Sequence, residues 1–501
     1  MGRTDSFVLS IDQGTSGTSA SLYDSACQRV ASVDIPVRSY FPQAGWVEQD
    51  PQELLASIKI AFHELVAQAG LQPGQIVSLG MANQGECLLV WDMDSGRPVY
   101  NLIGWQCVRS ADYCRRLSEN GQEDRFRRIS GLPLDPEWPA TKIPWLLENV
   151  PEIRNLLEGG RLAFSQSDSW FMRHLTVEKT FRTDHTTASR SGLYNLETRT
   201  WDLDLIRLFQ ADSLAFPEVR DSASDFGTVD FGEGWLIPWR GNALDQPAAL
   251  LGQACLDPGD AKVTYGTCAA FWYTHGLSVP RTNAMEASVA WSIDGHPTYA
   301  LVGEAITGGA AVVWLRKEFK LSRKDSQLAE IARLSQDQDE VIFVPALSGL
   351  GAPYREPNVR AAFYGMTAGT GLPHLVRAVL NAVAFGVRDI LEAFESGEGR
   401  SLRGQLKVDG GMSRNDYLMQ FQADILGRKL IVPQNMEGTS SGVAFLAGYA
   451  SDFYPGPDVL KQSWITERVY EPQMPERNRE ELYQRWKQVV QHTIALYREI
   501  E

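Results

Sequence analysis

The sequence predicts an α/β protein made of two similar halves. Segments of strand length alternate with segments of helical pattern along most of the chain, which is typical of α/β architectures. Each half also opens in the same way: "SIDQGTSGTSASLYD" (10–24) and "KVTYGTCAAFWYTHG" (262–276) are apolar on both sides of a turn that contains Gly and Thr. We therefore expect a duplicated architecture, with an N-terminal domain over residues 1–254 and a C-terminal domain over residues 255–501.

Length and composition fit an ordinary globular protein. The chain has 501 residues, of which 44% are hydrophobic and 22% charged, enough for two or three domains. Its net charge of −15 argues against general binding to nucleic acids or to membrane surfaces, because these polyanions would repel it. No apolar segment reaches the length of a membrane span, and the six cysteines contain no CxxC pair. We expect a cytoplasmic protein with reduced thiols.

Apolar patterns and capping signals predict the elements of the first half. Short apolar runs broken by Gly, Pro or polar turns predict strand-and-turn segments at 6–24, 35–51 and 76–92. A helix is expected from Pro51 to Ala69, because Asp50 is a good N-cap and proline is tolerated at the first helical position.

The second half contains a strand, a turn and a helix over residues 405–427. The strand ends on Asp409 and a Gly-Gly turn follows. The helix has an apolar face made of Leu418, Phe421, Ile425 and Leu426. The charged amphipathic segment 476–501 predicts a C-terminal helix that caps the fold. No low-complexity linker separates the halves, so we expect them to pack closely and to hinge.

The first turn, after Asp12, combines a carboxylate with hydroxyl and backbone N–H groups. Such donors suit phosphate oxygens, and a carboxylate beside them suits a divalent cation. An ordinary hairpin has the same composition, so this turn alone leaves both interpretations open.

Several stretches match a known family in sequence and in order. They are "IDQGTSGTSASLYD", "YFPQAGWVEQDP", "NQGECLLVWDMDSGRPVYNLIGWQ", "SGLPLDPEWPATK", "TDHTTASRSGLYN", "ALDQPAALLGQACLDPGDAKVTYGT", "VPALSGLGAPY" and "VDGGMSRNDYLMQFQADILG". Over nearly the whole chain these resemble the FGGY carbohydrate kinases, and within them the glycerol kinases. The resemblance implies two duplicated actin/hexokinase-like (ribonuclease H-like) domains with an interdomain cleft. It also implies transfer of the γ-phosphoryl group of ATP, with Mg²⁺, to a hydroxyl of a polyol or sugar.

The resemblance implies roles for matching residues in the cleft. Asp245 in "ALDQPAAL" matches the catalytic base that accepts the proton of the attacking hydroxyl, and a helix-capping role for the same residue is compatible with this. Gln246 would bind the acceptor, and Asp12 would bind Mg²⁺. The two turns would bind the phosphates through Thr15, Ser16, Gly17, Gly266 and Thr267.

The adenosine site is expected in the C-terminal domain. Gly410, Gly411 and Asn415 match the adenosine-binding turn, and Gly309 should lie against the nucleotide. The alternative interpretation is that these glycines only allow a helix start to pack on a strand. Val313 stands where the family often has Gln, so the adenine contacts are expected to be less polar.

Several positions depart from the glycerol kinase pattern, most of them at the acceptor end. An Arg, a Tyr and a Phe of the family are replaced here by Gly85, Glu137 and Ala270. These changes remove bulk and add a carboxylate, so we expect a longer, hydroxyl-rich acceptor such as a tetritol, a pentitol or a ketose. Ser19 also replaces an arginine near the phosphates, which leaves that site less positive.

The expected hydroxyl partners of the acceptor are Glu86, Glu137, Asp245 and Gln246, with Trp105 and Trp138 as apolar walls. Packing in the core is an equally good interpretation of both Trp. Three alternatives to a longer-chain polyol kinase remain: glycerol kinase proper, a degenerate kinase that senses a ligand, and an actin-like ATPase. If the chain is a kinase, its partner is a small-molecule polyol or sugar. Assembly into a homodimer or homotetramer is left open.

Overall fold

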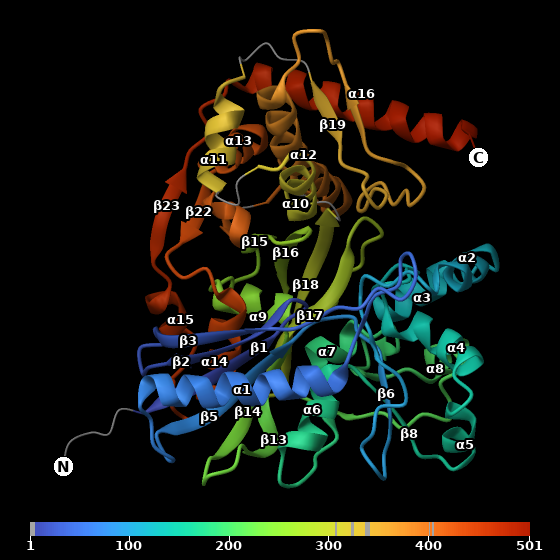
Figure 1. Cartoon of the computed structure of the whole chain (residues 1–501), viewed down its shortest axis with the longest axis vertical. Coiled ribbons are helices and arrows are strands. Elements are labelled where there is room, and N and C mark those ends of the chain that lie inside the picture. The colour runs from blue at the N-terminus through green and yellow to red at the C-terminus, as the bar shows by residue number, and fades with distance from the viewer. Residues whose placement is uncertain are drawn as a thin grey trace.

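The computed structural model has two α/β halves, with the N-terminal half (blue to green) below the C-terminal half (yellow to red) in the view of Figure 1. It describes residues 6–305, 308–321, 325–335, 341–399, 401–402 and 405–500. Helices α14 and α15 belong to the C-terminal part of the chain but lie beside the N-terminal sheet (Figure 1).

Each half is built on one mixed sheet. The N-terminal sheet has six strands in the order β13-β14-β5-β1-β2-β3. Their bounds are β1 Phe7–Gln13, β2 Gly17–Tyr23, β3 Arg29–Pro36, β5 Ile76–Asn83, β13 Ala223–Asp230 and β14 Leu236–Leu244. The C-terminal sheet has seven strands in the order β17-β18-β16-β15-β21-β22-β23. Their bounds are β15 Ala261–Tyr265, β16 Ala269–Gly276, β17 Glu286–Ile293, β18 His296–Ala305, β21 Leu406–Asp409, β22 Leu430–Pro433 and β23 Thr466–Tyr470.

Both sheets share one pairing pattern. In each, the first strand (β1 or β15) pairs antiparallel with the second and parallel with a later strand (β5 or β21). That later strand pairs parallel with β14 or β22, and the second strand pairs antiparallel with β3 or β18. The duplication expected from the repeated strand–turn–strand motif is therefore confirmed.

Helix α1 (Pro51–Ala69) packs on the N-terminal sheet (Figure 1). Asp50 caps it by accepting a hydrogen bond from the backbone N–H of Gln52 at 2.8 Å, as predicted. The side chains of Leu54, Ile58, Phe62 and Leu65 share one buried core cluster with the sheet. Burial of each such side chain contributes about 1.5–3 kcal/mol, more than differences in helix propensity of up to about 0.7 kcal/mol per residue. The apolar face therefore decides where this helix lies.

The strand expected within 35–51 is wrong in position. Strand β3 ends at Pro36, and the rest of that segment contributes only β4 (Glu48–Gln49). Strand β3 is an edge strand in which no side chain is fully buried, yet Ala31, Val33 and Ile35 alternate with polar residues and pack against the core. The alternation therefore lies at 29–36, before the start that we expected.

A large insertion between β5 and β13 completes the N-terminal half. It has its own core cluster, which includes Trp138, Ile143, Phe164 and Phe209. Its strands are β6 Leu89–Asp92, β7 Leu102–Ile103, β8 Leu162–Ser165, β9 Arg182–Asp184, β10 Tyr194–Asn195, β11 Thr200–Trp201 and β12 Glu218–Arg220. Its helices are α2 Ala111–Glu119, α3 Glu123–Ser130, α4 Pro139–Asn149, α5 Ile153–Glu158, α6 Ser167–Leu175, α7 His185–Ser189 and α8 Leu203–Leu208.

The C-terminal sheet is covered by helices that follow its strands. These elements are α10 Gly309–Glu318, α11 Asp325–Arg333, β19 Ile342–Val344, β20 Ala362–Tyr364, α12 Leu372–Glu398, η1 Gly411–Arg414, α13 Asp416–Leu426, α15 Asp458–Ser463 and α16 Glu476–Ile500. Helix α16 is fixed to α12 by Tyr483 and Trp486, whose polar hydrogens bond Asp389 at 2.7 and 2.9 Å. The predicted C-terminal cap is therefore a well-anchored helix.

The two halves are joined through helices α14 (Gly438–Tyr449) and α9 (Asp245–Gly252), which contact each other extensively. They approach so closely that a Cβ at Gly442 would lie 1.9 Å from the carbonyl oxygen of Ala248. A Cβ at Gly252 would lie 1.9 Å from the carbonyl oxygen of Gly438. Only glycine permits this approach. The halves pack closely, as expected, and the contact holds the helix that begins at Asp245.

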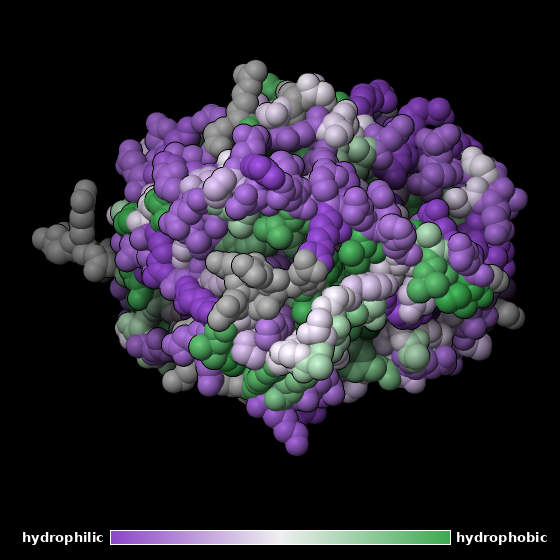
Figure 2. Space-filling view, turned by 90° about the horizontal axis from the view of Figure 1, so that it is seen from above, coloured by the Kyte–Doolittle hydropathy of each residue, from purple (hydrophilic) through white to green (hydrophobic). Residues whose placement is uncertain are grey.

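Hydrophilic residues cover most of the face seen in Figure 2, and apolar residues show there as scattered patches. Among the helices in the described ranges, none combines the length and the apolar character needed to cross a bilayer.

Candidate active site

The first turn joins β1 to β2, with Asp12 opposite Ser19 in the strand register. A pocket of about 420 Å³ lies here, lined by Asp12, Gly14, Ser16, Gly17, Ser19, Asp34, Ile35 and Pro36. Burial, followed by the charge of Asp245, raises the pKa of Asp12 to about 8. Its Oδ1 is buried and makes no hydrogen bond within the described part of the chain. A buried carboxylate oxygen without a donor fits a divalent cation, since Mg²⁺ is bound through one or two carboxylates.

Ser19 does not contribute a donor to this pocket. Its hydroxyl donates to the carboxylate of Asp34 on the neighbouring strand β3. The position where the family has an arginine is thus occupied by a hydroxyl bound to a second acid. The described lining of the pocket contains two carboxylates and no cationic side chain. Phosphate binding at this turn, as predicted, would depend on backbone N–H groups and on a bound cation.

Asp245 is the first residue of α9, and Leu244 rather than Asp245 is the N-cap. The Oδ1 of Asp245 accepts the backbone N–H of Gln246 at 2.7 Å, so the carboxylate still binds the helix start. Burial, followed by the charge of Glu86, raises the pKa of Asp245 to about 7. A carboxyl group that titrates near neutral pH suits a general base.

The second turn and helix α10 are held against each other by backbone contacts. The N–H of Gly309 donates to the carbonyl of Gly266 at 2.9 Å, and that of Gly308 donates to Thr267 at 3.1 Å. A Cβ at Gly309 would lie 2.4 Å from the Gly266 oxygen, so this glycine is required by packing. Gly266 and Thr267 themselves are exposed and able to meet a ligand.

The turn after β21 lies beside the second turn. Gly410 has φ +86° and a Cβ there would lie 2.6 Å from the carbonyl oxygen of Tyr265. Gly411 is exposed. Asn415 is 1% exposed, and its Oδ1 accepts the Leu418 N–H at 3.0 Å as the N-cap of α13. The Asn415 oxygen therefore caps helix α13, and the contact of Asn415 with adenosine stays a prediction.

Val313 lies on α10 with 63% of its surface exposed. It offers an apolar surface at the position where the family often has a polar amide. The expectation of less polar adenine contacts stays a prediction.

At the acceptor end, Gly85 does not leave an empty space. A Cβ at this position would lie 2.3 Å from Cδ2 of Leu244. Leu244 therefore occupies the room that a side chain at position 85 would need. The expectation that glycine at this position adds space to the pocket is wrong. Glu86 follows with φ +56°, a left-handed conformation that is rare for a non-glycine residue and concentrates at functional sites.

A buried arginine that was not predicted from the sequence organises the acceptor end. Arg190 follows α7 and is 2% exposed. Its Nε donates to Glu86 at 2.6 Å and its Nη1 donates to Glu286 at 2.9 Å. Its guanidinium lies 4.7 Å from the ring centre of Trp138. Arg190 thereby brings together segments that are about a hundred residues apart in the chain.

Of the two Trp predicted as walls, Trp138 belongs to the core. It is 0% exposed and its Nε1–H donates to the carbonyl of Pro133 at 2.6 Å. Trp105 is partly exposed and its Nε1–H donates to the hydroxyl of Thr15 at 3.1 Å. Trp105 thus connects the acceptor end to the first phosphate turn.

Two further carboxyl groups face this region. Glu137 and Glu304 are partly exposed, and burial raises the pKa of Glu304 to about 7 and that of Glu137 well above its usual range. Glu304 lies on β18 opposite Ala270 of β16 and accepts a weak bond from the Cys268 thiol at 3.6 Å. Ala270, a predicted acceptor contact, is fully buried. The polar group at this place in the sheet is the carboxyl group of Glu304.

Two lysines bond to segments that carry predicted site residues. Lys142 donates to the carbonyls of Glu86 and Glu137 at 2.9 and 2.6 Å. Lys262 donates to Oε1 of Gln246 at 2.9 Å. Both lysines are fully buried, and neither was singled out from the sequence.

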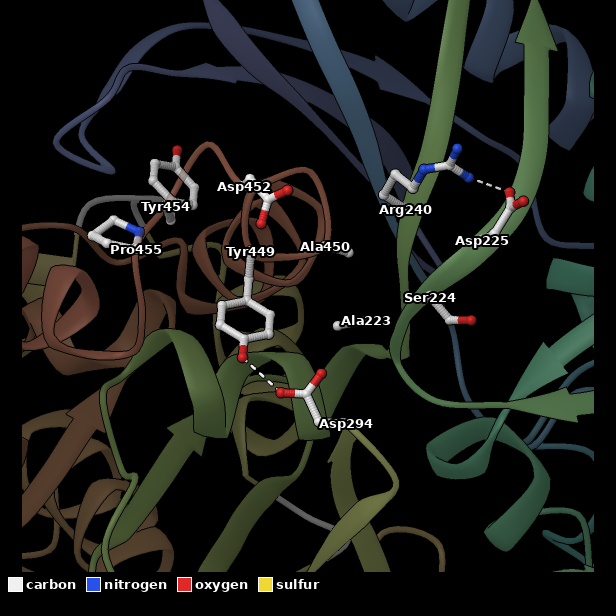
Figure 3. Close-up of a pocket in the computed structure, with 10 residues that line it drawn as sticks. All are labelled: Ala223, Ser224, Asp225, Arg240, Asp294, Tyr449, Ala450, Asp452, Tyr454 and Pro455. Atoms are coloured by element: carbon white, nitrogen blue, oxygen red, sulfur yellow. Dashed lines mark hydrogen bonds and ion pairs between the residues drawn. The ribbon is translucent and has the colours of Figure 1, made fainter.

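A larger pocket, of about 490 Å³, lies away from these residues (Figure 3). Figure 3 shows Arg240 paired with Asp225, and the hydroxyl of Tyr449 bonded to Asp294 at 2.7 Å. None of the predicted site residues lines this pocket.

Comparisons with known proteins agree with this architecture. Residues 7–252 match the N-terminal domain model of the FGGY family of carbohydrate kinases, and residues 261–451 match its C-terminal domain model. Glycerol kinase 2 of Pseudomonas aeruginosa is 40% identical over 490 residues, covering 97% of each chain. A glycerol kinase of Caldanaerobacter subterraneus subsp. tengcongensis is 39% identical over 490 residues, covering 97% of this chain and 98% of the other.

Solved structures show the same fold. Plasmodium falciparum glycerol kinase with ADP has a TM-score of 0.89 and 31% identity, with 98% of each chain covered. A ligand-bound xylulose kinase from Lactobacillus acidophilus, at 20% identity, has a TM-score of 0.87 with 99% of this chain and all of the other covered. The chain belongs to the FGGY family of carbohydrate kinases and is a phosphotransferase that uses ATP and Mg²⁺ to phosphorylate a sugar or polyol.

Proposed function

We propose that the chain phosphorylates a polyol or sugar of four or more carbons, such as a tetritol, a pentitol or a ketose, in preference to glycerol. The observation that carries this proposal is the set of carboxyl groups at the acceptor end. Glu86, Glu137 and Glu304 act on one another electrostatically, and Glu86 and Glu304 also act on Asp245.

These carboxyl groups match hydroxyls better than they match an apolar or a small acceptor. A carboxylate only accepts hydrogen bonds, whereas a protonated carboxyl group both donates and accepts. Burial raises the pKa of Glu304 to about 7, which allows both forms near neutral pH, and it also raises the pKa of Glu137. Each hydroxyl also donates and accepts, so an acceptor with several hydroxyls can satisfy the set. Glycerol, with fewer hydroxyls, would leave polar groups unpaired, which sites of this kind penalise strongly.

The proposal rests on the hydrogen-bonding groups of the pocket and not on added space. Leu244 fills the space beside Gly85, and Ala270 is buried. The acceptor would therefore have to be long and thin, reaching from Asp245 toward Glu137 and Glu304, rather than broad. An alditol chain has that shape.

In the proposed reaction Asp245 is the base and the two turns bind the phosphates. The carboxylate of Asp245 accepts the proton of the acceptor hydroxyl as the new O–P bond forms. The bond between the γ-phosphorus and the bridging oxygen breaks, and ADP leaves with that electron pair. Thr15, Ser16, Gly17, Gly266 and Thr267 would bind phosphate oxygens, with Gly309, Gly410 and Gly411 against the rest of the nucleotide.

Asp12 is the residue that would hold Mg²⁺, because its Oδ1 is buried and lacks a donor. When bound there, Mg²⁺ neutralises charge on the phosphate oxygens. The carboxylates of Asp12 and Asp34 would repel the anionic nucleotide, and a divalent cation would offset this repulsion.

A coupled ADP-release assay tests the proposal. The acceptors are glycerol, erythritol, threitol, ribitol, arabitol, xylitol and common ketoses, with an acceptor-free reaction as the control. We expect at least one longer acceptor to exceed glycerol in kcat/KM by about tenfold or more, the range that a few hydroxyl contacts provide. A panel in which glycerol has the highest kcat/KM would make the chain a glycerol kinase proper and overturn the proposal.

A further inference from the structure

A hydrogen-bond network centred on a buried lysine runs between the proposed acceptor site and the proposed nucleotide site. Lys262, on β15, is completely buried. Its Nζ donates to Oε1 of Gln246 at 2.9 Å and to the hydroxyl of Thr264 at 2.6 Å. The Thr264 hydroxyl donates to Oδ1 of Asp409 at 2.5 Å, and Gln253 donates to Oδ2 of the same carboxylate at 2.6 Å.

Each end of this network is next to a functional residue. Gln246 follows Asp245 directly. Asp409 ends β21 and directly precedes Gly410 and Gly411, the turn predicted to hold adenosine. Thr264 lies two residues before Gly266 of the second phosphate turn. The network therefore ties three segments of the site together through the buried side chains of Lys262, Gln253 and Asp409 and the partly exposed side chains of Gln246 and Thr264.

The chemistry of Lys262 fixes the orientation of Gln246. An ammonium group can only donate hydrogen bonds, so the amide group of Gln246 must turn its oxygen toward Lys262. The amide N–H groups of Gln246 are then the part that can meet an acceptor hydroxyl. Charge-assisted bonds of this kind are stronger than neutral ones, and leaving a buried polar group without its partner is costly.

We propose that Lys262 is a positioning residue that couples acceptor binding to nucleotide binding. Through Gln246 it orients the acceptor end, and through Thr264 and Asp409 it holds the turn that precedes the nucleotide. A ligand that tightens one end restricts the shared network, so the other end needs less ordering when its own ligand arrives.

The chain offers a matched control. Lys407 on β21 is the direct cross-strand partner of Lys262. Its Nζ donates to the backbone carbonyls of Gln253 and Ala254 at 2.8 and 3.0 Å and lies 4.5 Å from the ring centre of Trp464. Lys407→Met removes an ammonium group from the neighbouring position without removing a bond to Gln246 or to the Asp409 carboxylate.

The test measures KM for MgATP and for glycerol, the acceptor named for the relatives, together with kcat, in the full chain and its variants. Lys262→Met should raise both KM values by about tenfold. Thr264→Val removes the bond from Lys262 to Thr264 and the bond from Thr264 to Asp409, but it keeps the bond from Lys262 to Gln246. It should therefore raise KM for MgATP by about fivefold and leave KM for glycerol within about twofold. Lys407→Met should leave both within about twofold.

A purely structural role would reduce the amount of active enzyme and leave both KM values unchanged. Unchanged KM values in folded Lys262→Met, or equal effects of Lys407→Met, would overturn the inference. If Lys262→Met does not fold, Thr264→Val decides, and an unchanged KM for MgATP contradicts the coupling.

This inference rests on the proposed nucleotide and acceptor sites, and one further measurement separates its failure from theirs. If the wild-type chain turns over no polyol, the proposed acceptor is wrong, and calorimetry with MgADP alone still tests the network. We then expect binding to Thr264→Val to be about fivefold weaker than to wild type. Equal binding would overturn the inference by itself.

Discussion

The proposed nucleotide end and the proposed acceptor end of the site are held together by different kinds of contact. At the nucleotide end, backbone contacts and glycines set the geometry: Gly266 bonds Gly309, and Gly410 lies against Tyr265. At the acceptor end, charged side chains set it, with Arg190 bound to Glu86 and Glu286.

The difference shows which part of a kinase can change its specificity. A turn that must approach a phosphate or another strand closely accepts glycine and little else. A pocket lined by long side chains can exchange an arginine for a glycine and let a neighbour such as Leu244 fill the space. The reaction can therefore be kept while the acceptor changes.

The largest effect is expected where the two ends meet. Asp245→Asn keeps the size of the side chain but cannot accept the proton, so kcat should fall by about 10²–10⁴-fold. Because Asp245 titrates near pH 7, the wild-type rate should also fall as pH drops through about 7, where the base becomes protonated. Initial rates from pH 5.5 to 9 measure both.

The control for this variant is Asp225→Asn, which removes a carboxylate of the pocket in Figure 3. It should keep the wild-type rate, and Asp245→Asn should bind MgADP as wild type does. A near-normal kcat in Asp245→Asn would remove Asp245 from the role of base.

A smaller effect is expected from Asp12→Asn at the nucleotide end. Loss of a metal ligand should lower kcat/KM for MgATP by about 10–100-fold. The same substitution should increase the stability of the folded chain when Mg²⁺ is absent. The pKa of Asp12 is about 8 in the folded chain, against 3.8 for the free side chain, so the folded state holds a proton that the unfolded state loses between these values. Its contribution to stability therefore decreases as pH rises from about 4 to 8.

Without Mg²⁺, Asp12→Asn should raise the free energy of unfolding by about 1–2 kcal/mol at pH 8 and by less at pH 6. Urea unfolding at the two pH values measures this. A variant that is less stable than wild type at pH 8 would mean that Asp12 has a structural partner.

At the acceptor end, Glu304→Gln should change specificity rather than chemistry. Loss of the carboxylate should raise KM for the preferred polyol by about tenfold and leave KM for MgATP unchanged. The charge-matched control is Glu197→Gln, an exposed residue that pairs with Arg281. An equal rise in KM for glycerol and for the longer polyol would show that Glu304 does not distinguish acceptors by length.

The smallest effect is expected from Ser19→Arg. An arginine here would meet Asp34, which now binds the Ser19 hydroxyl, and would return a positive charge to the phosphate pocket. Because the new guanidinium would be largely neutralised by Asp34, KM for MgATP should fall by only about threefold. Ser19→Arg with Asp34→Asn should lower it further. A higher KM in the double variant would contradict this view of the pocket.

Features set by neighbouring residues could be predicted from the sequence. Helix α1 has the bounds that Asp50 and Pro51 predict, and the turn after β21 follows Asp409 as expected. Strand β3 was misplaced because the expected strand began only at Ile35, although Ala31, Val33 and Ile35 alternate with polar residues in the strand.

Contacts between distant segments could not be predicted in the same way. Arg190 lies within the quoted stretch "TDHTTASRSGLYN", but nothing local shows that it pairs with Glu86 and Glu286. Glu304 and Lys262 lie in strands whose partners are fixed by the fold. A charged residue inside an otherwise apolar strand, as in "LVGEA", is the signal that could have indicated them.

A competition experiment tests the central claim most directly. Glycerol, erythritol, threitol and xylitol are mixed at equal concentration with limiting MgATP, and the phosphorylated products are counted by mass spectrometry, so that their ratio equals the ratio of kcat/KM values. We expect phosphorylated four- or five-carbon products to exceed glycerol phosphate by about tenfold. A product mixture dominated by glycerol phosphate would contradict it.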